Sequence, residues 1–356
     1  MKGQYGYQSY RGRMTLRKFL AILIGVLAVA LALVVALYVY LQRYVVYTDE
    51  GARFELPFFQ GESQPPEESG GVNIVVENSP APSDGEERPE TAEPLRAVWV
   101  PAESLEADII QAQVEAAGGN AAVLDMKNAD GTLNYVSQLD LARQAGANPA
   151  EDRNAALREL NQGELYAIAR VACFKDGLLN TVDRSMNILT NSGYLWYGED
   201  QMYWTSPASG EVRAYLTGIA RELAELGFDE ILLDFAGYPT QGNLGWIRVG
   251  ESYPQGELDQ WIGQFYQEMA QALEDYEVKL SIRTTEEALR GEDSLSGQTA
   301  QNLAAWADRI WVEPSAQEDT DYAALLAAAG MEGAEEALVL ITQETEELTG
   351  GWARLP

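Results

Sequence analysis

The sequence contains no histidine and only one cysteine, Cys173. Without histidine the chain can form neither a Ser-His-Asp nor a Cys-His catalytic group, and it lacks the commonest zinc ligand. A single cysteine cannot form a disulfide within the chain. Cys173 lies in an apolar run (AIARVACF), where a buried, inert thiol is expected. Acid–base chemistry must therefore come from Asp, Glu, Tyr or Lys side chains.

Basic residues are also scarce, with 24 Lys and Arg against 55 Asp and Glu and a net charge of −31. So acidic a surface repels phosphate backbones, which argues against nucleic-acid binding and suits a neutral or cationic partner. No GxGxxG or P-loop sequence indicates a nucleotide, and we expect no cofactor. No metal is expected either, because Met126 stands where a calcium loop over DMKNADGTLNY (125–135) would need its first ligand.

The basic residues that are present gather before an apolar segment near the N-terminus. Residues 1–48 contain no acidic side chain, and residues 19–41 form an uncharged apolar run of 23 residues. As a helix, such a run crosses about 30 Å of hydrocarbon, and the positive-inside rule keeps the preceding residues cytoplasmic. The sequence predicts a cytoplasmic tail (1–18), a transmembrane signal anchor (19–41), an acidic, proline-rich linker (42–94) and an extracellular domain (95–356). A cleaved signal peptide is the alternative.

The predicted outer domain alternates short apolar runs with helical patterns. Strands are predicted at 95–101, 121–127, 165–171, 230–235, 278–284, 308–314 and 337–342, and the helices between them include 211–226 and 257–275. Repeated βα units with strands apolar on both faces indicate a parallel sheet covered by helices. Seven strands favour a (β/α)8 TIM-like barrel over a doubly wound sheet, which remains the alternative. Only residues 344–356 are left for an eighth strand, so the last unit is expected to be short, distorted or missing.

Carboxylates stand at the ends of the second, fourth and sixth predicted strands: Asp125, Asp234 and Glu313. In such a barrel these ends lie on one face, where active sites are built, and even-numbered strands feed the same layer of side chains. Alternation places Leu232 with Asp234, and Trp311 with Glu313, on one face of each strand. We therefore expect the three carboxylates to converge.

Paired carboxylates without histidine are typical of glycoside hydrolysis, where one protonates the leaving oxygen and the other attacks carbon or activates water. Asp234 is the predicted nucleophile or base, and Glu313, or alternatively Glu286, is the predicted general acid. Other polar and aromatic side chains near the strand ends could bind a sugar: Asp125, Lys127, Arg170, Trp204, Tyr238 and Trp246.

Four sequence blocks carry a resemblance to a known family: RAVWVPAESL, AAVLDMKNADGTLNYVSQLDLARQAGA, LYAIARVACFKDGLLN and LGFDEILLDFAGYP. In this order and spacing they resemble the "putative glycosyl hydrolase domain" family of bacterial membrane-anchored and secreted proteins, which implies a TIM barrel. The resemblance implies site roles for Asp125, Lys127, Arg170, Lys175, Asp176 and Asp234.

Two positions depart from the family pattern. Gly237 stands where the family keeps an arginine, so a guanidinium that could balance Asp234 is absent there, and Arg283 stands near a strand end where an acidic residue is usual. Two functions therefore stay open. One is a membrane-anchored glycoside hydrolase acting on a polysaccharide or cell-wall glycan. The other is a catalytically degenerate barrel that binds glycans or other components of the cell envelope. The oligomeric state is left open.

Overall fold

The computed structural model describes residues 45–48, 51–54, 93–101, 105–314, 320–343 and 350–356. The chain divides into two compact units, Met1–Ser83 and Asp84–Pro356. In the first unit, β1 (Val45–Thr48) and β2 (Gly51–Phe54) form an antiparallel hairpin inside the predicted linker. Within the described ranges, no helix is long and apolar enough to cross a membrane. The anchor predicted at 19–41 lies outside them and stays a prediction.

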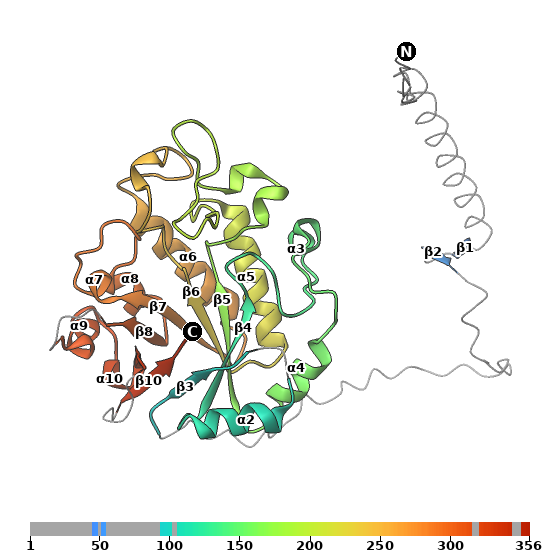
Figure 1. Ribbon diagram of the computed structural model, residues 1–356, viewed down its shortest axis with the longest axis horizontal. Coiled ribbons are helices and arrows are strands. Elements are labelled where there is room, and N and C mark those ends of the chain that lie inside the picture. Colours follow the sequence, from blue (N-terminus) through green and yellow to red (C-terminus); the bar gives the residue numbers. More distant parts are fainter. Residues whose placement is uncertain (1–44, 49–50, 55–92, 102–104, 315–319, 344–349) are drawn as a thin grey trace, which may run out of the picture. The chain divides into compact units, whose positions relative to one another are not determined.

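The second unit is a closed barrel of eight parallel strands (Figure 1). The strands are β3 (Arg96–Trp99), β4 (Ala121–Lys127), β5 (Tyr166–Ala172), β6 (Glu230–Asp234), β7 (Lys279–Thr285), β8 (Arg309–Glu313), β9 (Leu338–Ile341) and β10 (Gly351–Arg354). Each of the seven predicted strands is confirmed to within a few residues. The eighth, β10, is short but regular and pairs with both β9 and β3. Because this pairing closes the sheet, the doubly wound alternative is wrong.

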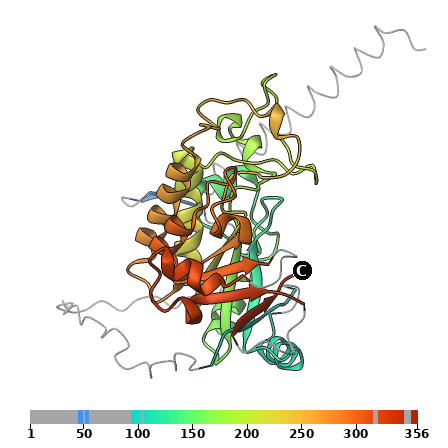
Figure 2. The ribbon, with the colours of Figure 1, turned by 90° about the vertical axis from the view of Figure 1, so that its left-hand side faces the viewer.

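Helices surround the strands on the outside (Figures 1 and 2). They are α2 (Ala107–Ala116), α3 (Asp140–Ala145), α4 (Asn154–Asn161), α5 (Gly210–Glu225), α6 (Leu258–Leu273), α7 (Glu286–Leu289), α8 (Ala300–Trp306), α9 (Tyr322–Ala328) and α10 (Ala334–Ala337). The Ser209 hydroxyl caps α5 by accepting from the Val212 N–H, and Gly227 follows the helix at φ 88°. The apolar side chains of α5, among them Leu216, Ile219 and Leu223, are buried, and the helix contacts β6 and α6.

Alternating strand residues fill the barrel interior. A small apolar cluster takes inward positions from most strands and includes Val123, Ile168, Leu232, Trp311 and Val339. The larger core cluster lies between the strands and the helices. Because side chains alternate along a strand, Asp234 and Glu313, each two residues after Leu232 and Trp311, face the same interior at the C-terminal ends of the strands.

A polar cluster occupies the opposite end of the interior, where β6 begins. Glu230 is fully buried and accepts hydrogen bonds from the Tyr166 hydroxyl (3.0 Å) and the Trp311 indole (3.2 Å). The Ser281 hydroxyl and the Arg309 guanidinium also donate to its carboxylate. This satisfied ionic cluster packs the N-terminal end of the barrel, whereas the pocket lies at the C-terminal end.

Candidate active site

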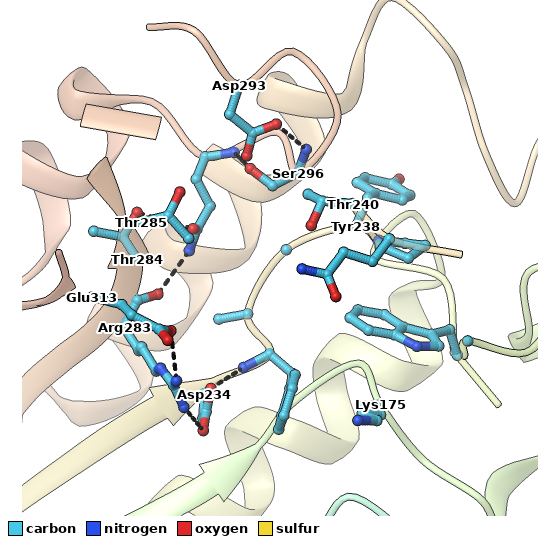
Figure 3. A pocket seen from close by; sticks show the side chains of 18 of the residues that line it. Lys175, Asp234, Tyr238, Thr240, Arg283, Thr284, Thr285, Asp293, Ser296 and Glu313 are labelled. Carbon is cyan, nitrogen blue, oxygen red and sulfur yellow. Dashed lines mark hydrogen bonds and ion pairs between the residues drawn. The ribbon is translucent and has the colours of Figure 1, made fainter. Parts of the chain in front are cut away.

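Five charged side chains of alternating sign cross the C-terminal end of the barrel, one from each of five neighbouring strands. Arg170 of β5 contacts Asp125 of β4 (Nη1–Oδ1, 3.0 Å) and Asp234 of β6 (Nη2–Oδ2, 2.7 Å). Arg283 of β7 contacts Asp234 (Nη1–Oδ2, 3.0 Å) and Glu313 of β8 (Nη2–Oε2, 2.8 Å), as Figure 3 shows. The structure therefore brings together the three carboxylates that the sequence predicted to converge.

Asp234 is the centre of this row, and its side chain is only 4 % exposed. Its Oδ2 accepts from both guanidinium groups, including Arg170 Nε at 2.8 Å, while its Oδ1 accepts the Phe235 N–H at 2.8 Å. Burial would lower the pKa of Arg283, but the carboxylates of Asp234 and Glu313 raise it overall. Two permanent cations thus balance a carboxylate that would otherwise be costly to bury.

The two positions that depart from the family pattern, Gly237 and Arg283, both line the pocket beside Asp234. A Cβ at Gly237 would lie 2.9 Å from the Ser296 carbonyl oxygen and 3.2 Å from its Cβ, so the loop at 293–298 fills the space of a side chain. Position 237 supplies no guanidinium to Asp234, but Arg170 and Arg283 supply two from the neighbouring strands.

Asp234, Arg283 and Glu313 line one side of a pocket of about 340 Å³ (Figure 3). The pocket is also lined by Lys175, Trp204 and Tyr238 from the sequence prediction, and by three acidic residues that it did not single out, Glu199, Asp200 and Asp293. Among the residues that the structure describes, no three His, Cys, Asp or Glu side chains are grouped to hold a metal ion. The chemistry that this pocket offers is that of carboxylates beside aromatic rings.

Residues 97–327 match the model of the family described as "Putative glycosyl hydrolase domain". This chain belongs to that family. The match covers most of the barrel and confirms the resemblance carried by the four sequence blocks. No curated protein matches the chain.

Several solved structures resemble the barrel. A hypothetical protein from Ruminiclostridium thermocellum is 26% identical, with 52% of this chain and 96% of that chain covered and a TM-score of 0.44. The PgaB (BpsB) glycoside hydrolase domain from Bordetella bronchiseptica is 12% identical, with coverages of 70% and 84% and a TM-score of 0.47. A group IV chitinase from Ostrinia furnacalis is 13% identical, with coverages of 70% and 66% and a TM-score of 0.38.

Four residues to which the family resemblance gave site roles do not line this pocket: Asp125, Lys127, Arg170 and Asp176. Asp125 and Arg170 still belong to the row of charges around Asp234, whereas Lys127 and Asp176 pair with one another. β4 has an irregularity between Asp125 and Lys127, so that Asp125 pairs with Arg170 but Lys127 pairs with the next residue, Val171. Val171 belongs to the core cluster between the strands and the helices. The bulge therefore turns Lys127 out of the barrel interior. Its Nζ contacts Asp176 Oδ2 at 2.8 Å, with the two side chains 0 % and 1 % exposed, and donates to the Ala172 carbonyl. This buried pair ties the loop after β5 to β4.

Glu286 and Trp246 also lie outside the lining of the pocket. Glu286 is the first residue of α7, and its buried carboxylate accepts from the Thr320 and Tyr322 hydroxyls, each at 2.7 Å. It also pairs with Arg290, so it is engaged on the helical side of the barrel. Trp246, 59% exposed, lies in the 3-10 helix η4 (Leu244–Trp246). Of the two candidate acids, Glu313 is the one that lines the pocket with Asp234.

Phe235 is a pocket residue that sequence reasoning missed. Its ring lies 4.4 Å from Lys175 Nζ and meets the Trp204 ring edge-on, with the centroids 6.2 Å apart. Lys175 also pairs with Asp200. Burial would raise the pKa of Asp200, but hydrogen bonds from Lys175 and from the Met202 N–H lower it overall. The signal in the sequence was an aromatic residue directly after the strand-end aspartate.

Proposed function

We propose that this protein hydrolyses O-glycosidic bonds in a polysaccharide or cell-wall glycan, with Asp234 and Glu313 as its catalytic pair. One observation carries the proposal: a single guanidinium, that of Arg283, contacts both Asp234 and Glu313. The distance between Asp234 Oδ2 and Glu313 Oε2 therefore cannot exceed the length of two hydrogen bonds plus the width of the guanidinium group, which is roughly 8 Å. That limit is compatible with retaining enzymes, at about 5–5.5 Å, and with much of the inverting range of about 6.5–9.5 Å.

The two carboxylates differ in their exposure and in the number of guanidinium groups that contact them. The Glu313 side chain is 55 % exposed, whereas the Asp234 side chain is 4 % exposed. In the proposed reaction Glu313 gives its proton to the glycosidic oxygen as the bond to the anomeric carbon breaks. Asp234 either forms a bond to that carbon, which a water molecule then breaks while giving a proton back to Glu313, or takes a proton from the water that attacks the carbon. A sugar entering between them separates Arg283 from Glu313, while Arg170 keeps its hold on Asp234.

The charge of the pocket supports a neutral or amine-bearing glycan. Besides the proposed pair, three carboxylates line it, and its two cations, Lys175 and Arg283, already contact carboxylates. A uronic acid or a sulfated sugar would meet excess negative charge there. The acidic composition of the whole chain also favours a neutral or amine-bearing glycan over an anionic one.

We further propose that the barrel acts outside the cytoplasm while tethered to the cell membrane. The support is in the sequence: the apolar run at 19–41, the basic residues before it and the acidic residues after it. An acidic, proline-rich segment between this run and the barrel suits an extended spacer.

A glycan-binding barrel without catalysis is the second candidate, and one observation favours it. Asp234 Oδ2 accepts from three N–H groups, and Arg283 stands between the two carboxylates where a sugar would be cleaved. If Arg283 stayed in place with a glycan bound, neither carboxylate could reach the anomeric carbon or the leaving oxygen.

Release of reducing ends from a glycan panel by the full-length protein distinguishes the two candidates. The panel contains a neutral glycan, chitosan as an amine-bearing glycan and a polyuronate. We expect the wild type to cleave one of the first two, and Asp234→Asn and Glu313→Gln to be slower by about 10²-fold or more. Glu286→Gln decides between the two candidate acids. Glu268→Gln is the matched control, because Glu268 of α6 pairs with Arg213 of α5 and neither residue lines the pocket.

Cleavage that survives Glu313→Gln would exclude Glu313 as the acid. Binding of a glycan without hydrolysis, equal in the wild type and Asp234→Asn, would support the second candidate.

A further inference from the structure

Phe235 has a backbone conformation that a bulky side chain rarely adopts. Its φ is 48°, and within the described part of the chain Gln201, at φ 63°, is the other non-glycine residue in the left-handed region. Gln201 is exposed, whereas Phe235 is half-buried directly after Asp234. Backbone strain of this kind persists only where the surrounding contacts fix it, and it gathers at functional sites.

Contacts to its backbone and to part of its ring hold Phe235 in this conformation. Its N–H donates to Asp234 Oδ1 (2.8 Å), and its carbonyl accepts the Phe174 N–H (3.1 Å). Lys175 Nζ lies over the ring at 4.4 Å, and Trp204 meets the ring at an interplanar angle of 90°. Both the backbone and the ring are therefore fixed by neighbours that also surround the pocket.

The left-handed turn changes which way the ring points. In a regular strand, the residue after an inward-facing side chain faces outward. Asp234 faces the barrel interior, so a continued strand would send the next side chain into the helical layer. Instead, Asp234 and Phe235 both line the pocket. The strained backbone thus places an aromatic ring beside the buried carboxylate.

We infer that the ring of Phe235 is the apolar floor on which a pyranose stacks at the position next to Asp234. The ligand class is a sugar that offers a face of C–H groups, in a neutral or amine-bearing glycan. The same turn aims the Phe235 N–H at Oδ1 and leaves Oδ2 to the two guanidinium groups, so the residue also orients the carboxylate. This inference rests on the proposed function only for the identity of the ligand as a glycan.

The test measures oligosaccharide binding and stability on the full-length chain, and neither needs hydrolysis. The probes are pentasaccharides of glucose, glucosamine and N-acetylglucosamine, with tryptophan fluorescence as the readout because Trp204 adjoins the Phe235 ring. Phe235→Asn is the key variant, since asparagine tolerates the left-handed region. We expect it to unfold at the wild-type urea concentration or higher, and to bind the preferred probe roughly tenfold more weakly.

Three further variants separate the ring from the backbone. Phe235→Leu keeps the strained backbone without the ring, and is expected to bind as weakly as Phe235→Asn. Phe235→Tyr keeps the ring and is expected to recover most of the lost affinity. Gln201→Gly is the matched control for strain: it should raise the unfolding midpoint without weakening binding, because Gln201 is exposed and is not among the residues that line the pocket.

Wild-type affinity in both Phe235→Asn and Phe235→Leu would overturn the inference, as would failure of the wild type to bind any of the three probes. Binding that depends on Phe235 in a protein that cleaves no glycan would uphold the inference and reject the hydrolase. If the Phe235 variants hydrolyse and bind the glycan as well as the wild type does, the hydrolase is upheld and the inference about Phe235 is rejected.

Discussion

Replacing Lys127 with methionine is expected to destabilise the barrel severely. Lys127 Nζ lies 2.8 Å from Asp176 Oδ2 and 2.8 Å from the Ala172 carbonyl oxygen, and both charged side chains are within 1 % of complete burial. Asp176 Oδ1 in turn accepts the N–H groups of Leu178 and Leu179. The methionine variant would therefore leave a carboxylate buried without its cation.

Removing one partner of a buried ion pair costs about 3–5 kcal/mol, because the remaining charge stays desolvated. With a denaturant slope of about 3 kcal/mol per molar for a domain of this size, the urea midpoint should fall by about 1–2 M. Asp176→Asn should destabilise for the same reason. The loss of unfolding free energy in the double variant should be smaller than the sum of the two single losses by about 2 kcal/mol or more, because no unpaired charge is then buried.

Tryptophan fluorescence during urea unfolding measures this on the full-length chain, since all eight tryptophans lie within the barrel domain. Arg143→Met is the control, because Arg143 and Asp140 form an exposed pair with side chains 51% and 84% exposed, and it should barely move the midpoint. A midpoint unchanged in Lys127→Met would refute the structural role. If that variant also lost glycan binding, Lys127 would belong to the ligand site, as the family resemblance implied.

Two other predictions concern single positions. Gly237→Ala should destabilise the barrel by about 1–3 kcal/mol, because its Cβ would overlap the Ser296 backbone. Gly245→Ala, whose Cβ would meet nothing within 4 Å, should change the urea midpoint little. Burial raises the pKa of the Cys173 thiol well above its ordinary value. Native protein should therefore resist iodoacetamide at pH 8, where an exposed thiol is partly ionised, and react once unfolded in urea. Rapid alkylation of the folded protein would contradict the burial of Cys173.

Much of the fold follows from periodicity. The seven apolar runs correspond to strands because each is long enough, and apolar enough on both faces, to be recognised alone. The eighth strand, GWAR, is as short as β3 and β9, but it begins at Gly351 and ends at Arg354, so it is not an apolar run. Nothing local distinguishes such a segment from a loop. Its pairing with β3 and β9 makes it a strand, and that pairing depends on the closure of the whole barrel.

The candidate site was predictable where alternation holds and not where the backbone departs from it. Two-residue spacing places Asp234 after Leu232 and Glu313 after Trp311, and both carboxylates do face the pocket. At Lys127 the bulge shifts the alternation by one residue, which reverses the direction of the side chain. At Phe235 the left-handed turn does the same. Neither irregularity has a signature in the residues themselves.

The row of charges was beyond sequence reasoning for another reason. Arg283 pairs with Asp234 and Glu313 because β7 lies between β6 and β8. The register sets Ile282 beside Leu233, the residue before Asp234, and sets Arg283 beside Trp311, two residues before Glu313. Read alone, Arg283 was only a departure from the family pattern. Its meaning depends on neighbours far away in the sequence, and only the barrel makes them neighbours.

The closing strand sets the order in which this domain can fold. Arg96 and Trp352 are partners in the barrel although they lie at opposite ends of its sequence, so their pairing has the largest loop to close. Until β10 docks, β3 and β9 each present an open parallel edge on which another chain could add a strand. A chain in which β10 is not yet paired is therefore an open barrel with two edges prone to aggregation. The refolding yield at high protein concentration will depend on the rate of barrel closure relative to the rate of association between open barrels.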